Sequence, residues 1–182
     1  RPKATLHPPP LMRQPFNPYP DLNVIAIEKI NLPLKSRDEL PPILAGLQWI
    51  WTHPALKAEI FTLLEQKILA GKKATGRTGM DLWQILVLGV VRLGLDADGD
   101  RLEHLANYDA LLRQMLGVPQ LPWGVDAKVF NHQTLRDNVA LVDEALLQEI
   151  NALDSAAGRA VFKKKATAPA DPLALKADSY VL

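Results

Sequence analysis

A short basic segment of the chain is suited to contact a phosphate backbone. The segment reads "GKKATGRTG", and Lys72, Lys73 and Arg77 give it positive charge. Its glycines allow the main chain to approach a partner closely, and its cations would release counterions from a nucleic acid on binding. We therefore expect this loop to contact DNA phosphates.

A second group of polar side chains stands at the start of a predicted helix. Lys128 precedes "FNHQTLRD", and Gln133, Thr134 and Arg136 occupy the first turns. Helix-turn-helix proteins place base-reading side chains there, and Arg and Gln match the major-groove edges of guanine and adenine. Alternatively, Gln133 and Thr134 cap the helix and Arg136 pairs with a nearby acid. The preceding turn is longer than a tight helix-turn-helix has.

Other chemistries lack the residues they need. The chain has no cysteine, which excludes disulfides, thiolate metal sites and thiol catalysis. The histidines His7, His53, His104 and His132 show no metal-binding spacing, so we expect them in surface or capping roles. No Walker loop or nucleophile elbow is present.

The composition is that of a globular chain with balanced charge. Among 182 residues, 48% are hydrophobic, and 21 basic against 20 acidic side chains give a formal charge of +1. DNA binding would therefore depend on local clusters of Lys and Arg. The most apolar run, residues 82–95, is shorter than the roughly 20 residues that span a bilayer. We expect a soluble, intracellular protein with no membrane partner.

The elements that must position these side chains are mostly helical. Seven prolines in residues 1–20 disfavour regular structure, and period-two alternation over 24–29 suggests a short strand or extended arm. Thr78 and Asp81 resemble a capping box, and Asn131 is a candidate N-cap. The helix over 79–95 is apolar almost all round, so we expect it at the centre of a bundle. We expect helices over 41–52, 54–70, 79–95, 99–106, 109–116 and 131–153.

The pattern changes near the end of the sequence. Residues 163–172, "KKKATAPADP", have the composition of a linker, and the following "LALKADSYVL" is strand-like. We expect a proline-rich lead-in and arm over 1–34, a helical domain over 35–162, the linker, and the start of a further domain over 173–182.

The order of these segments resembles the N-terminal region of bacterial insertion-sequence transposases, and most closely those of the not-yet-classified group (ISNCY). The resemblance rests on "GRTGMDLWQILVLGVVRLGLDADGDRLEHLANYDALLRQMLG", which contains a Gly-Arg turn, a buried apolar helix, a Leu-Ala-Asn helix and an "RxxLG" close. "QTLRDNVALVDEALLQEIN" and "LKADSYVL" extend it, so that it covers most of residues 35–182. It implies a helical, helix-turn-helix-like bundle followed by the first strand of a truncated ribonuclease-H-like α/β domain.

What the resemblance implies is a DDE transposase, which cuts and joins DNA with three carboxylates and two Mg²⁺ ions. Asp178 stands where the first carboxylate and metal ligand would be. The second Asp and the Glu are absent, so we expect these residues alone to be catalytically inactive and to bind Mg²⁺ weakly. The implied partner is double-stranded DNA at insertion-sequence ends, with self-association through helices and a cytoplasmic, nucleoid-associated location in bacteria.

Two other interpretations stay open at this stage. A near-neutral helical bundle that exposes Trp49, Trp51 and Trp123 could bind another protein or its own copy, because aromatic side chains often anchor interfaces. The sequence is also consistent with a non-functional relic of a transposase gene.

Overall fold

The protein is built from helices, as the sequence predicts. The computed structural model describes residues 24–70, 80–120 and 128–164, and the mainly α-helical prediction is confirmed for this part. The strand expected over 173–182 lies outside it. In chain order the elements are the 3-10 helix η1 (Ile27–Lys29), α1 (Leu40–Thr52), α2 (Pro54–Leu69), α3 (Leu82–Gly94), α4 (Gly99–Tyr108), α5 (Ala110–Met115), α6 (His132–Val139) and α7 (Glu144–Lys164).

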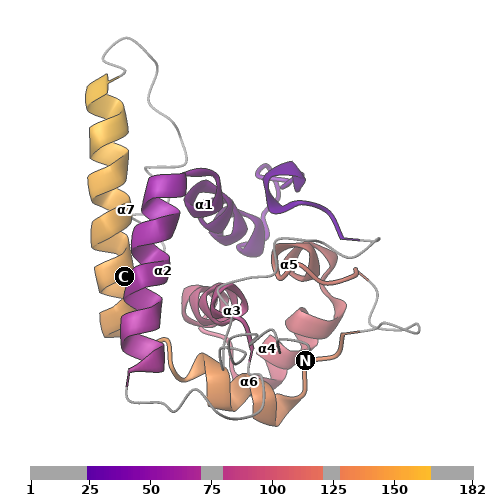
Figure 1. The fold of residues 1–182 in the computed structure, drawn as a ribbon. Helices are drawn as coiled ribbons and strands as arrows, with labels where there is room; N and C mark the ends of the chain where they lie inside the picture. Colours follow the sequence, from indigo (N-terminus) through magenta and orange to yellow (C-terminus); the bar gives the residue numbers. More distant parts are fainter. Residues whose placement is uncertain (1–23, 71–79, 121–127, 165–182) are drawn as a thin grey trace, which may run out of the picture.

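Helix α3 lies at the centre of the bundle, with α1, α2, α4, α5 and α6 around it (Figure 1). Almost every residue from Leu82 to Val91 is buried, which confirms the expected central helix. Two polar side chains on α3 are satisfied by main-chain carbonyls of the α5 C-terminal turn. The Trp83 indole N–H donates to the Met115 carbonyl oxygen at 2.9 Å, and the Gln84 amide donates to that of Leu116 at 3.1 Å.

The start of α3 differs from the prediction. The helix begins at Leu82 rather than near residue 79, and Asp81 is its N-cap residue. The capping-box assignment is therefore wrong for Asp81, because that motif needs its acid at the third helical position. Thr78 lies outside the described residues.

The single long helix expected over 131–153 is wrong, because the chain forms two helices there. Helix α6 ends at Val139, and α7 begins at Glu144 with a new N-cap, as the Asp143 carboxylate accepts a hydrogen bond from the Leu146 amide at 2.8 Å. Between them, Val142 is fully buried against α3. The predicted apolar stripe is nevertheless buried at Leu135, Val139, Val142, Leu146 and Ile150.

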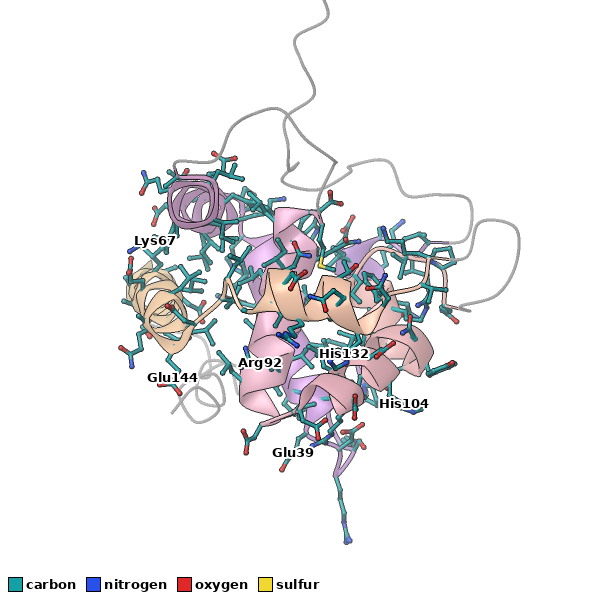
Figure 2. All side chains as sticks on the ribbon, turned by 90° about the horizontal axis from the view of Figure 1, so that it is seen from below. Glu39, Lys67, Arg92, His104, His132 and Glu144 are labelled. Atoms are coloured by element: carbon teal, nitrogen blue, oxygen red, sulfur yellow. The ribbon has the colours of Figure 1, made fainter. Side chains whose placement is uncertain are left out.

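Helix α7 runs alongside α2 in the opposite direction (Figures 1 and 2). Lys67, near the end of α2, forms an ion pair of 2.9 Å with Glu149, near the start of α7. The hydrogen bond and charge of Glu149 raise the pKa of Lys67, although both side chains are exposed and the pair therefore adds little stability. Helix α7 continues to Lys164, the second residue of the range predicted to be a linker.

The alternation over 24–29 suggested a short strand or an extended arm, and the strand is wrong, because Ile27–Lys29 form the single-turn helix η1. Ile27 and Ile30, three positions apart, are both buried in the same core as the helices. The Gln48 side-chain amide donates to the carbonyl oxygens of Ile27 at 2.8 Å and Ile30 at 2.9 Å. A side chain of α1 therefore satisfies carbonyls that a strand would offer to a neighbouring strand.

No helix in the described ranges has both the length and the apolar character needed to cross a bilayer.

Gly89 permits the close contact between α3 and the α6–α7 connection. A Cβ atom at this position would lie 2.6 Å from the Val142 Cβ atom, so Gly89→Ala should force the two segments apart and lower the free energy of unfolding by about 1–3 kcal/mol. Chemical denaturation measures the change.

The matched control for Gly89→Ala is Gly46→Ala. Gly46 lies within α1, and a Cβ atom added to it would meet no other atom within 4 Å, so alanine there should raise stability by roughly 0.5–1 kcal/mol through helix propensity. Equal effects of the two substitutions would contradict the close contact at Val142.

Candidate nucleic-acid interface

The segment that leads into α6 is fastened to α4 by the side chain of Asn107. The Phe130 amide donates to Asn107 Oδ1 at 2.8 Å, and Asn107 Nδ2 donates to the Phe130 carbonyl oxygen at 2.7 Å. Asn107 therefore replaces the partner that a neighbouring strand would supply to Phe130. The Phe130 ring is buried in the core, so the main chain enters α6 at a fixed place.

Arg113 on α5 reinforces this attachment from inside the protein. Its side chain is fully buried and donates to three main-chain carbonyl oxygens: Pro119 at 2.7 Å, Ala106 at 3.0 Å and Lys128 at 2.8 Å. Burial lowers the pKa of Arg113, but a guanidinium stays charged at neutral pH, and charge-assisted hydrogen bonds are the stronger kind. Arg113 thus links α4, α5 and the segment before α6.

Asn131 caps α6, as the sequence predicts. Its side-chain oxygen accepts a hydrogen bond from the Thr134 amide at 2.8 Å. Leu135, Asn138 and Val139 face inward and are buried. The side chains of Gln133, Thr134 and Arg136 are exposed on the outer face of the same helix. The structure therefore brings three of the predicted DNA-contacting residues together at the surface.

The structure does not show the alternative roles considered for these three residues. The Gln133 amide donates to the Asp137 carboxylate at 2.7 Å, one turn along α6, and does not cap the helix. Thr134 contributes its main-chain amide to the cap made by Asn131. Within the described ranges, no carboxylate oxygen lies within 4 Å of a nitrogen of the Arg136 guanidinium.

Lys128 is exposed beside the start of α6, and its ammonium lies 5.9 Å from the centre of the Phe130 ring. Its charge also acts on Asp81, the N-cap residue of α3. Burial raises the pKa of Asp81, and the positive charge of Lys128 lowers it by a smaller amount.

Four of the predicted functional residues lie outside the described ranges. Lys72, Lys73 and Arg77 fall in the segment between α2 and α3, and Asp178 falls beyond α7. Their roles as phosphate contacts and as a metal ligand therefore stay predictions.

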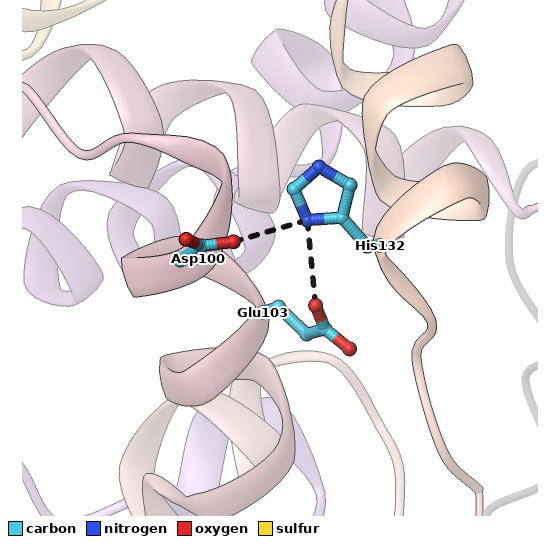
Figure 3. Close-up of side chains that lie close together, drawn as sticks. All are labelled: Asp100, Glu103 and His132. Atoms are coloured by element: carbon cyan, nitrogen blue, oxygen red, sulfur yellow. Dashed lines mark ion pairs between the residues drawn. The ribbon is translucent and has the colours of Figure 1, made fainter.

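A cluster of side chains that sequence reasoning missed stands next to the exposed face of α6. His132 Nδ1 lies 3.5 Å from Asp100 Oδ1 and 3.4 Å from Glu103 Oε2, the two acids being on α4 (Figure 3). The three-residue interval between Asp100 and Glu103 places them on one face of a helix. His132 is distant in the sequence, and only the packing of α6 on α4 reveals the cluster.

The charge around α6 is mixed. Lys128 and Arg136 are exposed cations, whereas Asp100, Glu103 and Asp137 place carboxylates nearby. Such a surface does not attract DNA over a long distance, and contacts here would depend on short-range hydrogen bonds.

Comparison of the chain with protein-family models, with curated proteins and with solved structures found no match.

Arg113→Met should strongly destabilise the protein, because it leaves three carbonyl oxygens, one buried and two partly buried, without their donor. Methionine is long and flexible enough to fill the space of the arginine side chain. The decrease in the free energy of unfolding therefore measures mainly the loss of the three hydrogen bonds. We expect a decrease of about 3 kcal/mol or more in the free energy of unfolding, measured by denaturant titration. The exposed Arg37→Met is the control. A similar small change in both variants would contradict the role given to Arg113.

The raised pKa of Asp81 should make the stability of the protein depend on pH. Folding raises this pKa above the ordinary value of 3.8, so the folded state holds the proton more tightly than the unfolded state does. Protonation of Asp81 therefore stabilises the folded state. This stabilisation is fully present below the pKa that Asp81 has in the unfolded state, and it is lost as the pH rises through the pKa that Asp81 has in the folded state. Asp81→Asn keeps a residue type that is favoured at N-caps. Because asparagine does not ionise, the variant does not lose stability as the pH rises through the pKa of Asp81.

The stability gained by Asp81→Asn, relative to the natural residue, should therefore be larger at about pH 7 than at about pH 4. Thermal unfolding of both proteins at the two pH values measures the difference. A gain that is equal at both pH values, or larger at the lower one, would show that folding does not raise the pKa of Asp81.

Proposed function

We propose that the helical region binds double-stranded DNA through the exposed face of α6, as the N-terminal part of a DDE-type transposase. The observation that carries this proposal is the joint exposure of Gln133, Thr134 and Arg136 on a capped helix whose other face is locked into the core. These residue types hydrogen-bond to base edges and phosphates.

The dimensions of α6 support an approach to the major groove. An α-helix with its side chains is about 10–12 Å across, which fits the major-groove width of about 12 Å, and the 8 residues of α6 give about two turns that could lie in the groove. Its N-terminal turn carries the candidate side chains, and free main-chain amides at a helix N-terminus also favour phosphate oxygens. Gln133 would exchange its hydrogen bond with Asp137 for one with a base.

The mixed charge around α6 favours modest affinity. Lys128 and Arg136 supply two phosphate-binding cations, while the carboxylates of Asp100 and Glu103 repel phosphates nearby. The basic residues Lys72, Lys73 and Arg77 are the additional source of charge that the sequence offers. Binding would then combine a few direct contacts by α6 with phosphate contacts by this loop.

DNA cleavage is not assigned to these residues. Asp178 is one carboxylate, and one carboxylate does not fit the two-Mg²⁺ centre that the resemblance implies. The resemblance to transposases supplies the expected ligand, DNA from insertion-sequence ends, and the exposed face of α6 supplies the expected contact.

A protein-binding role has less support from the described residues. The Trp51 ring packs 4.9 Å from the Trp83 ring, with the Lys57 ammonium 4.0 Å from its centre, and the Trp49 ring lies 3.5 Å from the His53 ring. Both tryptophan side chains therefore already pack against residues of this chain. Trp123, the third candidate anchor, lies outside the described residues. Self-association through helices stays a proposal that sizing with and without DNA can test.

Arg136→Ala should weaken binding to a labelled duplex, because it removes an exposed donor able to bind bases or phosphates. We expect a loss of roughly five- to tenfold at low salt, measured by fluorescence anisotropy. The matched control is Arg37→Ala, an exposed arginine remote from α6 in the sequence. Equal affinities of wild type, Arg136→Ala and Arg37→Ala would exclude α6 as the contact, and no binding by wild type would exclude the function.

The same assay tests the basic loop. Replacing Lys72, Lys73 and Arg77 together by alanine should flatten the dependence of log K on log salt by up to about 3 units. An unchanged slope would remove this loop from the interface while leaving the α6 contact to be judged by Arg136→Ala.

A further inference from the structure

We propose that Asp100, Glu103 and His132 form a binding site for a divalent transition-metal ion, best matched by Zn²⁺. The site joins the first turn of α4 to the first residue of α6 (Figure 3). Its three residues differ from Asp178, the ligand that the transposase resemblance implies for a Mg²⁺ centre. The site also does not depend on whether α6 binds DNA.

The donor set is suited to such an ion. The site offers one imidazole nitrogen and two carboxylate oxygens, all within 4.8 Å of one another. Imidazole suits Zn²⁺ and its neighbours in the first transition row, whereas Mg²⁺ and Ca²⁺ prefer oxygen ligands alone. Three protein ligands with the fourth position open to water is a common arrangement for Zn²⁺.

The distances from His132 Nδ1 to the two carboxylates are longer than usual hydrogen bonds, and they fit either ion pairs with a protonated imidazole or ligands around a metal ion. N–H···O hydrogen bonds usually span about 2.7–3.2 Å, but His132 Nδ1 lies 3.5 Å from Asp100 Oδ1 and 3.4 Å from Glu103 Oε2. Two ligand atoms each about 2.1 Å from a tetrahedral Zn²⁺ are about 3.4 Å apart. Both nitrogen–oxygen separations therefore already match the edges of a zinc coordination tetrahedron.

The imidazole of His132 is held in this orientation by contact with a glycine. A Cβ atom on Gly99 would lie 2.6 Å from the ring Cε1 atom and 3.2 Å from Nε2, so the ring packs directly over the main chain of Gly99. Gly99 is the first residue of α4, next to Asp100. The same short segment thus supplies one carboxylate and fixes the imidazole that faces it.

The site is accessible and lies between two elements. The exposed fractions of the side chains are 47% for His132, 95% for Asp100 and 36% for Glu103, which leaves room for a water ligand. An ion held here would link α4 to α6 and would neutralise the two carboxylates. Binding to the folded state alone would also raise the unfolding temperature.

Titration calorimetry of the chelator-treated 182-residue protein with Zn²⁺ tests the site. Wild type should bind one ion here, and His132→Ala and Glu103→Gln should each weaken that binding by roughly tenfold or more. The matched control is His104→Ala. His104 is an exposed histidine on α4, on the same side of the bundle as His132 on α6 (Figure 2). It should leave the affinity unchanged, and Mg²⁺ should bind far more weakly than Zn²⁺.

Gly99→Ala provides a second variant that leaves all three ligands in place. Its methyl group should displace the exposed imidazole without disturbing the core, so Zn²⁺ binding should weaken while the helix content stays the same. Visible absorption of bound Co²⁺ reports the geometry, because tetrahedral Co²⁺ absorbs strongly. The absence of saturable Zn²⁺ binding by wild type, or an affinity unchanged in His132→Ala and Glu103→Gln, would overturn the proposal.

Discussion

The buried guanidinium of Arg113 is the interaction on which the position of α6 depends. Its three hydrogen bonds end on α4, on the segment after α5 and on Lys128, just before α6. A buried charge is costly unless its donors are satisfied, so the surrounding carbonyl oxygens must remain in place. Asn107 adds two hydrogen bonds to Phe130, and together these side chains fix where the chain enters α6. The exposed face of α6 is therefore a consequence of polar contacts inside the bundle.

The two surfaces proposed for ligands share the start of α6. Asn131 caps the helix, His132 turns toward the carboxylates of α4, and Gln133 and Thr134 face solvent. A divalent ion beside His132 would remove the negative charge that opposes phosphate binding there. If both proposals hold, metal and DNA should each strengthen the binding of the other, because a coupling between two sites is reciprocal.

Periodicity predicted the elements that are determined locally. The apolar run of α3 and the regular stripe of α2 gave helices within a few residues of their observed bounds. The break between α6 and α7 was missed because the stripe continues through it. Burial of Val142 against Gly89 and capping by Asp143 are what separate the helices. The signal that was available is Asp143 itself, a common N-cap residue type.

The candidate sites were predictable only where residues are close in the sequence. Gln133, Thr134 and Arg136 share one exposed face because they follow a capped helix start. The pairing of His132 with Asp100 and Glu103 depends on how α6 packs on α4, which no local pattern encodes. Arg113 belongs to the "RxxLG" close, and its buried structural role appears only once the carbonyls around it are seen.

Amide hydrogen exchange with and without duplex DNA tests the central claim, that DNA lies against the start of α6. If DNA binds there, it should slow exchange most over residues 131–137, while the amides of α2 and α7 should be unaffected. DNA-dependent protection confined to α2, α7 or α1, with α6 unchanged, would contradict it.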